Sequence, residues 1–144
     1  MHCSFYDNNQ CRSCAWLDQS YPEQLRRKEA HLNSLLAEFS PPPLHTTAHS
    51  ETAGFRDKAK MVVLGSAESP KLGIINHRGQ AIGLCNCPLY SKDMQKLLGE
   101  LENWLGQLRI APYQVNNRQG ELKFVLLNRN NENQYMLRLV LRST

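Results

Sequence analysis

The stretch SKDMQKLLGELENWLGQLR, residues 91–109, carries the strongest structural signal in this chain. Its apolar side chains recur every three or four positions and therefore share one face of a helix: Met94, Leu97, Leu98, Leu101, Trp104, Leu105 and Leu108. Ser91 stands where an N-cap is needed, because its hydroxyl oxygen can accept a backbone N–H from the first turn. The stretch predicts a long amphipathic helix.

Strand patterns flank this helix on both sides. Before it, apolar runs at 61–64 and 72–75 predict two short strands, and a tight turn at 76–79 leads into a third at 81–84. After it, alternating side chains at 122–126 and 135–141 predict a hairpin. This mixture predicts an α+β fold class, with a β-rich central domain that contains the one long helix.

A second helix is expected near the N-terminus. Pro22 suits a first helical turn, where its missing N–H costs nothing, and leucines follow it at helical spacing. The run SPPP at 40–43 ends this helix, because proline cannot continue it. We expect three parts: a cysteine-bearing segment and helix over 1–39, a Pro/Thr-rich linker over 40–53, and the central domain over 54–144.

Composition and charge narrow the class of protein. Apolar residues make up 41% of the 144, enough for one domain with a core, and no apolar run approaches the roughly 18 residues that span a bilayer. The polar, cysteine-bearing N-terminus does not look like a secretory signal, so we expect a cytoplasmic protein without a membrane segment. The 17 Lys and Arg against 13 Asp and Glu give a net charge of +4, which permits a polyanionic partner without requiring one.

Five cysteines fall in two groups, Cys3, Cys11 and Cys14 at the start and Cys85 and Cys87 in the middle of the chain. An odd number in a cytosolic chain argues against a disulfide framework. The CxxC at Cys11 and Cys14 lets two thiolates bind one metal from a single turn. Together with thiolates from elsewhere, it could complete a site for Zn²⁺ or an iron–sulfur cluster.

Two features favour an iron–sulfur cluster over zinc. A proline follows Cys87, as it does in cluster-binding sequences, and the Cys85-Asn-Cys87 spacing departs from the paired CxxC of zinc ribbons. Either Cys85 or Cys87 could supply the fourth ligand, although only Cys87 precedes proline. Two other hypotheses remain: a stand-alone zinc-stabilised RNA-binding module, and a structural domain whose cysteines are unligated core side chains.

A short basic segment precedes the first predicted strand. Arg56, Lys58 and Lys60 alternate along it, so in a strand they project from one face, where they could contact phosphates. The neighbouring Phe55 could stack on a base or pack in the core. The pattern also fits an ordinary solvent-exposed strand face. No glycine-rich phosphate loop, paired histidines or Ser–His–Asp arrangement accompanies it, so the residues alone indicate no active site.

The order of these motifs resembles that of one known family. It is similar to the bacterial RNA uracil-C5 methyltransferases in five places: Cys3…Cys11-Arg-Ser-Cys14, GFRDKAKM at 54–61, CNCPL at 85–89, RQGELK at 118–123 and MLRLVLRS at 136–143. The resemblance covers essentially the whole chain. Within the family it looks most like the branch that methylates uridine 747 of 23S ribosomal RNA.

The resemblance implies a cofactor and a partner. The cofactor is a [4Fe-4S] cluster held by Cys3, Cys11, Cys14 and Cys87, with Cys85 left out. The partner is 23S ribosomal RNA, contacted by a monomeric protein through the basic segment: Phe55, Arg56, Lys58 and Lys60.

The resemblance also implies an incomplete enzyme. In the family, S-adenosylmethionine, the nucleophilic cysteine and the general base all belong to a Rossmann-like methyltransferase domain, which is absent from this sequence. No catalytic residue is therefore expected here. We expect an N-terminal fragment that is inactive on its own.

Overall fold

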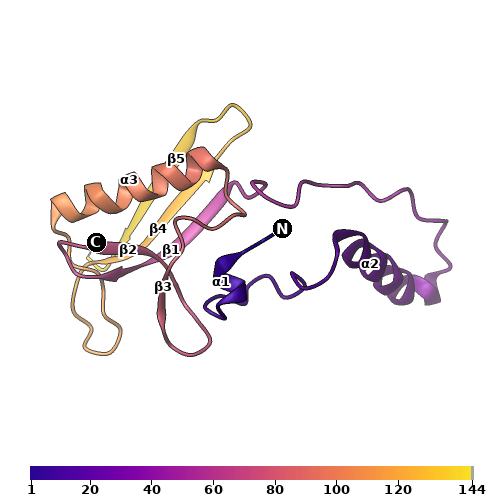
Figure 1. Ribbon diagram of the computed structural model, residues 1–144, viewed down its shortest axis with the longest axis horizontal. Coiled ribbons are helices and arrows are strands. Elements are labelled where there is room, and N and C mark those ends of the chain that lie inside the picture. Colours follow the sequence, from indigo (N-terminus) through magenta and orange to yellow (C-terminus); the bar gives the residue numbers. More distant parts are fainter. Residues whose placement is uncertain (144) are drawn as a thin grey trace.

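The computed structural model describes residues 1–143 and confirms the α+β fold class. In chain order the elements are α1 (Ser4–Asp7), α2 (Tyr21–Leu36), a 3-10 turn η1 (Ala37–Phe39), β1 (Lys58–Gly65), β2 (Pro70–Ile75), β3 (Ala81–Gly83), α3 (Lys92–Leu108), β4 (Leu122–Arg129) and β5 (Tyr135–Leu141). Figure 1 shows the sheet and α3 together at one end of the molecule and α2 apart at the other. Thr144, the last residue of the predicted central domain, lies outside the described residues.

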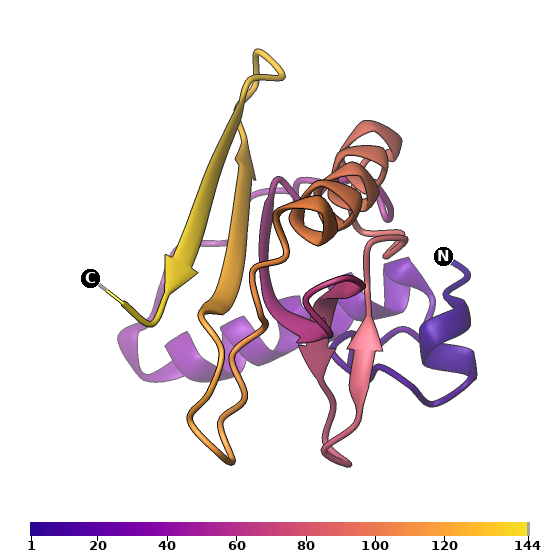
Figure 2. The same ribbon diagram turned by 90° about the vertical axis from the view of Figure 1, so that its left-hand side faces the viewer.

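The five strands form one sheet in the order β3-β2-β1-β4-β5. Every pair of neighbouring strands is antiparallel, so residues 1–143 contain no parallel sheet of the Rossmann type. The first three strands follow one another as a meander, and β4 and β5 form the predicted hairpin. Helix α3 carries the chain from the β3 edge back to β4, which pairs with β1 (Figure 2).

The predicted long helix covers one face of the sheet. Its N-cap is Ser91, whose Oγ accepts the Met94 N–H at 3.3 Å, and it ends at Arg109 in the left-handed region with φ 51°. The buried residues of α3 are Met94, Leu98, Leu101 and Leu105, and those of the sheet beneath it are Ala59, Met61, Val63, Leu72, Leu122, Val125 and Leu127. Trp104 and Leu108 were predicted on the same apolar stripe but are exposed, because the stripe is wider than the contact with the sheet.

Strand β4 buries different residues from those its alternation indicates. The pattern places Leu122, Phe124 and Leu126 on one side, whereas the structure buries Leu122, Val125 and Leu127. The cause is a register shift between Leu122 and Phe124 where β4 pairs with β5. One extra residue at such a bulge moves every later side chain to the opposite face.

Helix α2 forms as predicted but does not join the core. Ser20 caps it by accepting the Glu23 N–H, and Pro22 stands in its first turn. None of its residues is buried, and Leu35 at 60% exposure lies on an uncovered apolar face. The division of the chain at residues 40 and 54 stays a prediction. Neither α2 nor any other helix in residues 1–143 combines the length and hydropathy needed to cross a membrane.

The packing of α3 on the sheet can be tested with two leucine truncations in the same helix. Leu98 is fully buried and Leu108 is 45% exposed. We expect Leu98→Ala to lower the free energy of unfolding by about 2–5 kcal/mol, through lost burial and the cavity left behind. Leu108→Ala, the matched control, should cost well under half as much. Urea titrations followed by circular dichroism measure both, and equal losses would contradict this packing.

Candidate functional site

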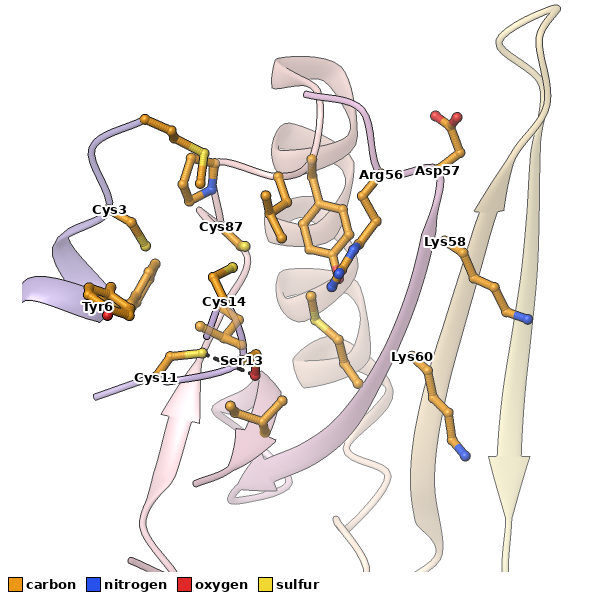
Figure 3. A pocket seen from close by; sticks show the side chains of 18 of the residues that line it. Cys3, Tyr6, Cys11, Ser13, Cys14, Arg56, Asp57, Lys58, Lys60 and Cys87 are labelled. Atoms are coloured by element: carbon orange, nitrogen blue, oxygen red, sulfur yellow. Dashed lines mark hydrogen bonds between the residues drawn. The ribbon is translucent and has the colours of Figure 1, made fainter. Parts of the chain in front are cut away.

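Four of the five cysteines line one cavity of about 590 Å³. Cys3, Cys11 and Cys14 come from the N-terminal segment, and Cys87 comes from the loop between β3 and α3 (Figure 3). Arg56, Lys58 and Lys60 line the same cavity. The structure therefore brings together cysteines that are more than seventy positions apart in the sequence.

The N-terminal segment is positioned by its own turns and by contacts with the core and with the turn after β2. The backbone N–H groups of Tyr6 and Asp7 both donate to the Cys3 carbonyl at 3.0 Å, and the Cys11 N–H donates to the Phe5 carbonyl at 3.0 Å. The Phe5 side chain packs against the core. Asn76, in the turn after β2, donates from Nδ2 to the Gln10 carbonyl at 3.1 Å. These contacts bring Cys3 and Cys11 to the same side of the cavity.

The opposite side of the cavity is built by two loop segments that pair with each other. The Cys87 N–H donates to the Leu84 carbonyl at 3.0 Å, which holds this loop in a turn. The Gly54 N–H donates to the Pro88 carbonyl at 2.9 Å and the Arg56 N–H to the Leu89 carbonyl at 2.8 Å. This pairing sets Arg56 beside Cys87.

The thiols of this cavity influence one another's ionisation. Burial raises the pKa of Cys14 above its ordinary value, and the negative charges that Cys11 and Cys3 would carry raise it further, whereas Arg56 lowers it. Burial also raises the pKa of Cys87, against a hydrogen bond from the Leu89 backbone that lowers it; Cys14 and Cys3 add to the increase. The positive charge of Arg56 opposes the increase in pKa at both Cys14 and Cys87.

Four cysteines are the donor type of both a structural zinc site and an iron–sulfur cluster. No group of three or more His, Cys, Asp or Glu side chains within residues 1–143 is arranged to hold one metal ion. A tetrahedral zinc site needs all four sulfurs about 2.3 Å from one point. In a cluster each thiolate binds a different iron, so the sulfurs stand farther apart around a larger volume. The four cysteines that line this cavity could supply the ligands of either arrangement.

Cys85 lies outside the cavity and in a different environment. Its sulfur is 3.9 Å from the Leu72 carbonyl, and Glu102 of α3 stands beside it. Burial, followed by the charge and hydrogen bonding of Glu102, raises the pKa of Cys85 to about 12. Of the two cysteines that could have been the fourth ligand, only Cys87 faces the other three.

The predicted basic segment is divided by the structure. Lys58 and Lys60 share the exposed face of β1, as predicted for a strand. Arg56 precedes the strand, and Figure 3 shows its side chain directed away from the two lysines, on the side of Cys14 and Cys87. Phe55 is 48% exposed and faces a second cavity that Trp16 and Tyr21 also line. The single face predicted for Arg56, Lys58 and Lys60 therefore holds for the lysines only.

One further residue that the sequence did not single out helps to build the site. Arg129, at the end of β4, donates from Nε to Asp57 Oδ1 at 2.8 Å and from a terminal nitrogen to the Ser91 hydroxyl at 3.0 Å. Its backbone N–H also donates to the Asp57 carbonyl. Arg129 thereby joins the hairpin, the segment that carries Arg56 and the N-cap of α3. No local pattern reveals this role, because its partners are distant in the sequence.

The environment of Cys85 predicts unusually slow thiol chemistry. With a pKa of about 12, only about one Cys85 in ten thousand is a thiolate at pH 8. In the metal-free folded chain we expect iodoacetamide to modify Cys85 more slowly than any of the four cavity cysteines, with a rate that rises up to pH 10 without a plateau. Peptide mass spectrometry measures each site. In guanidinium chloride the five rates should converge, and equal rates in the folded chain would contradict this environment.

Curated proteins similar to this chain carry one common description. Over 99% of the chain, it is 44% identical to 23S rRNA (uracil(747)-C(5))-methyltransferase RlmC of Xenorhabdus nematophila, 45% identical to the protein so named in Shewanella loihica, and 43% identical to that of Yersinia pestis. In each comparison the chain covers 38% of the relative. No family model matches the chain.

A solved structure shares the fold. The tRNA (uracil-54, C5)-methyltransferase of Pyrococcus abyssi, crystallised with S-adenosyl-L-homocysteine, superposes with a TM-score of 0.68 at 15% sequence identity. The superposition covers 87% of this chain and 30% of that one. The resemblance predicted from the sequence is thereby confirmed: along nearly its whole length this chain is similar to the 23S rRNA (uracil747-C5)-methyltransferases, of whose length it spans about 38%.

Proposed function

We propose that this chain is the N-terminal part of an S-adenosylmethionine-dependent methyltransferase that forms 5-methyluridine at position 747 of 23S ribosomal RNA. Its own tasks are to hold a [4Fe-4S] cluster and to contribute to RNA binding. The observation that carries the proposal is the cavity in which four cysteines meet Arg56, Lys58 and Lys60. The names of its relatives supply the reaction and the RNA.

The cluster would be held by Cys3, Cys11, Cys14 and Cys87. Bound there, it supplies a covalent link between the N-terminal segment and the loop that precedes α3. The protein's own contacts in this region include the Phe5 and Cys11 side chains against the core and the Asn76 hydrogen bond to Gln10. Methyl transfer moves no net electrons, so we assign the cluster a structural role.

RNA contact would be made by the basic segment, Phe55, Arg56, Lys58 and Lys60. Arg56, Lys58 and Lys60 are exposed, and no ion pair involves any of the three among the described residues. Free cationic side chains are the groups that contact phosphates. Phe55 is half exposed and adjoins Arg56, where an unstacked base could lie against its ring.

The cluster can be tested with two cysteine variants from the same loop. After anaerobic purification we expect a brown protein with broad absorption near 400 nm and about four irons and four sulfides per chain. Cys87→Ala should lose most of the iron, because it removes a ligand. Cys85→Ala, two positions earlier and outside the cavity, should retain it.

Other results would decide among the remaining hypotheses. A colourless protein with one zinc per chain would contradict the cluster and support the hypothesis of a zinc-stabilised RNA-binding module. A metal-free protein that unfolds at the same urea concentration with and without Cys87 would support unligated core cysteines. Iron loss in both variants would contradict the assignment of the fourth ligand to Cys87.

Because we assign cluster and RNA binding to this chain and catalysis to another part of the enzyme, we expect this chain alone to be inactive. Incubated with labelled S-adenosylmethionine and an RNA hairpin of 23S rRNA that contains uridine 747, it should transfer no methyl group. The reason is that the family resemblance places the methyl-donor site, the nucleophilic cysteine and the general base in a domain outside these residues. Nucleoside analysis by mass spectrometry measures 5-methyluridine, and turnover would overturn the proposal.

A further inference from the structure

Within residues 1–143, one face of the sheet is covered by no helix. Helix α3 lies on the face that carries Met61, Leu72 and Leu127, while α2 lies apart at the far end of the molecule (Figure 1). We define the open face as the outward side chains of the three strands β1, β4 and β5: Lys58, Lys60, Val62 and Leu64; Phe124, Leu126 and Asn128; and Met136, Arg138 and Val140.

The charge of this surface has one sign. None of the strands, all of which lie within the described residues, contains an aspartate or glutamate. On the open face Lys58, Lys60 and Arg138 are exposed, and none of these three forms an ion pair with another described residue. A surface of unpaired cations without acids favours a polyanion over a second protein surface.

Strand register sets the cations around an aromatic ring. Lys60 pairs with Leu126, and Leu126 pairs with Arg138, so the two cations stand two strands apart, about 10 Å. In the next row Phe124 stands between Val62 and Val140. The ammonium of Lys60 lies 4.9 Å from the centre of the Phe124 ring. The register therefore puts an aromatic ring one row away from two cations on the flanking strands, and surfaces that bind single-stranded RNA combine basic groups with aromatic rings in this way.

We propose that the open face binds a single-stranded stretch of RNA, with Lys60 and Arg138 on its phosphates and Phe124 stacked on a base. The inference deepens the proposed function and rests on it. When a phosphate binds the Lys60 ammonium, this ammonium moves off the Phe124 ring. The ring face that it covered is then free to stack on the base. The RNA then lies across β1, β4 and β5, not along the basic segment alone.

The open face is continuous with the cysteine cavity. Lys58 and Lys60 belong to the open face and also line that cavity. RNA bound across the three strands therefore passes the cavity at β1, next to the segment that carries Arg56. The cavity and the open face together form one binding surface.

The test compares charge removal on the open face with charge removal on α3, the helix that covers the other face of the sheet. Arg138→Gln removes one cation from the open face, and Lys96→Gln removes one from the exposed side of α3, where Lys96 is 79% exposed. Binding of the uridine-747 hairpin RNA is titrated by fluorescence anisotropy at several salt concentrations. We expect Arg138→Gln to lower the slope of log K against log salt by about 0.7, the value for one phosphate contact on a single strand, and Lys96→Gln to leave it unchanged.

A second variant tests the stacking. Phe124→Leu keeps an apolar side chain but removes the aromatic face, and it should weaken binding at least about fivefold. Circular dichroism of each variant shows that the sheet is intact, and Arg138→Lys should restore the salt slope.

The outcomes separate this inference from the proposed function. If the unaltered chain binds the RNA, but Arg138→Gln and Phe124→Leu bind it equally well, the open face is not the RNA surface and the proposed function stands. In that case the face is covered by another protein segment. If the unaltered, iron-loaded chain shows no salt-dependent binding at all, both the inference and the RNA role of the proposed function are wrong.

Discussion

The packing of α3 against the sheet is the contact on which the rest of the structure depends. Met94, Leu98 and Leu105 are fully buried, and their partners on the sheet come from β1, β2 and β4. Because β4 reaches its place beside β1 only after the chain has crossed the sheet as α3, this contact also sets the strand order. Without it, five short strands would have no common core.

The same packing also positions the site, through contacts at the N-terminal end of α3. Ser91 begins α3 and accepts a hydrogen bond from Arg129, which in turn binds Asp57. The segment that includes Arg56 is thus fixed between the helix and the hairpin, and its backbone pairs with the loop of Cys87. The cysteine cavity is therefore a consequence of how the sheet, the helix and the hairpin meet.

The two faces of the sheet differ in composition because α3 packs against one of them and not against the other. The covered face is apolar and supplies stability. The open face has apolar side chains among cations that form no ion pair with another described residue, and an exposed patch of this kind is typical of a binding surface. Because of the bulge in β4, Phe124 lies on the open face and Val125 lies in the core. One extra residue therefore determines on which face of the sheet the aromatic ring lies.

The sequence alone determined the elements: the α3 stripe, the end of α2 at the triple proline, the hairpin and the grouping of cysteines are all local patterns. Local spacing does not report what lies across the fold, however. Only the tertiary structure could place Cys87 opposite Cys3, Cys11 and Cys14 and set Cys85 beside Glu102, since those distances depend on how distant segments pair. For the same reason it alone decided that Arg56 turns away from Lys58 and Lys60, that α2 stays outside the core, and that Phe124 lies on the open face with Arg138.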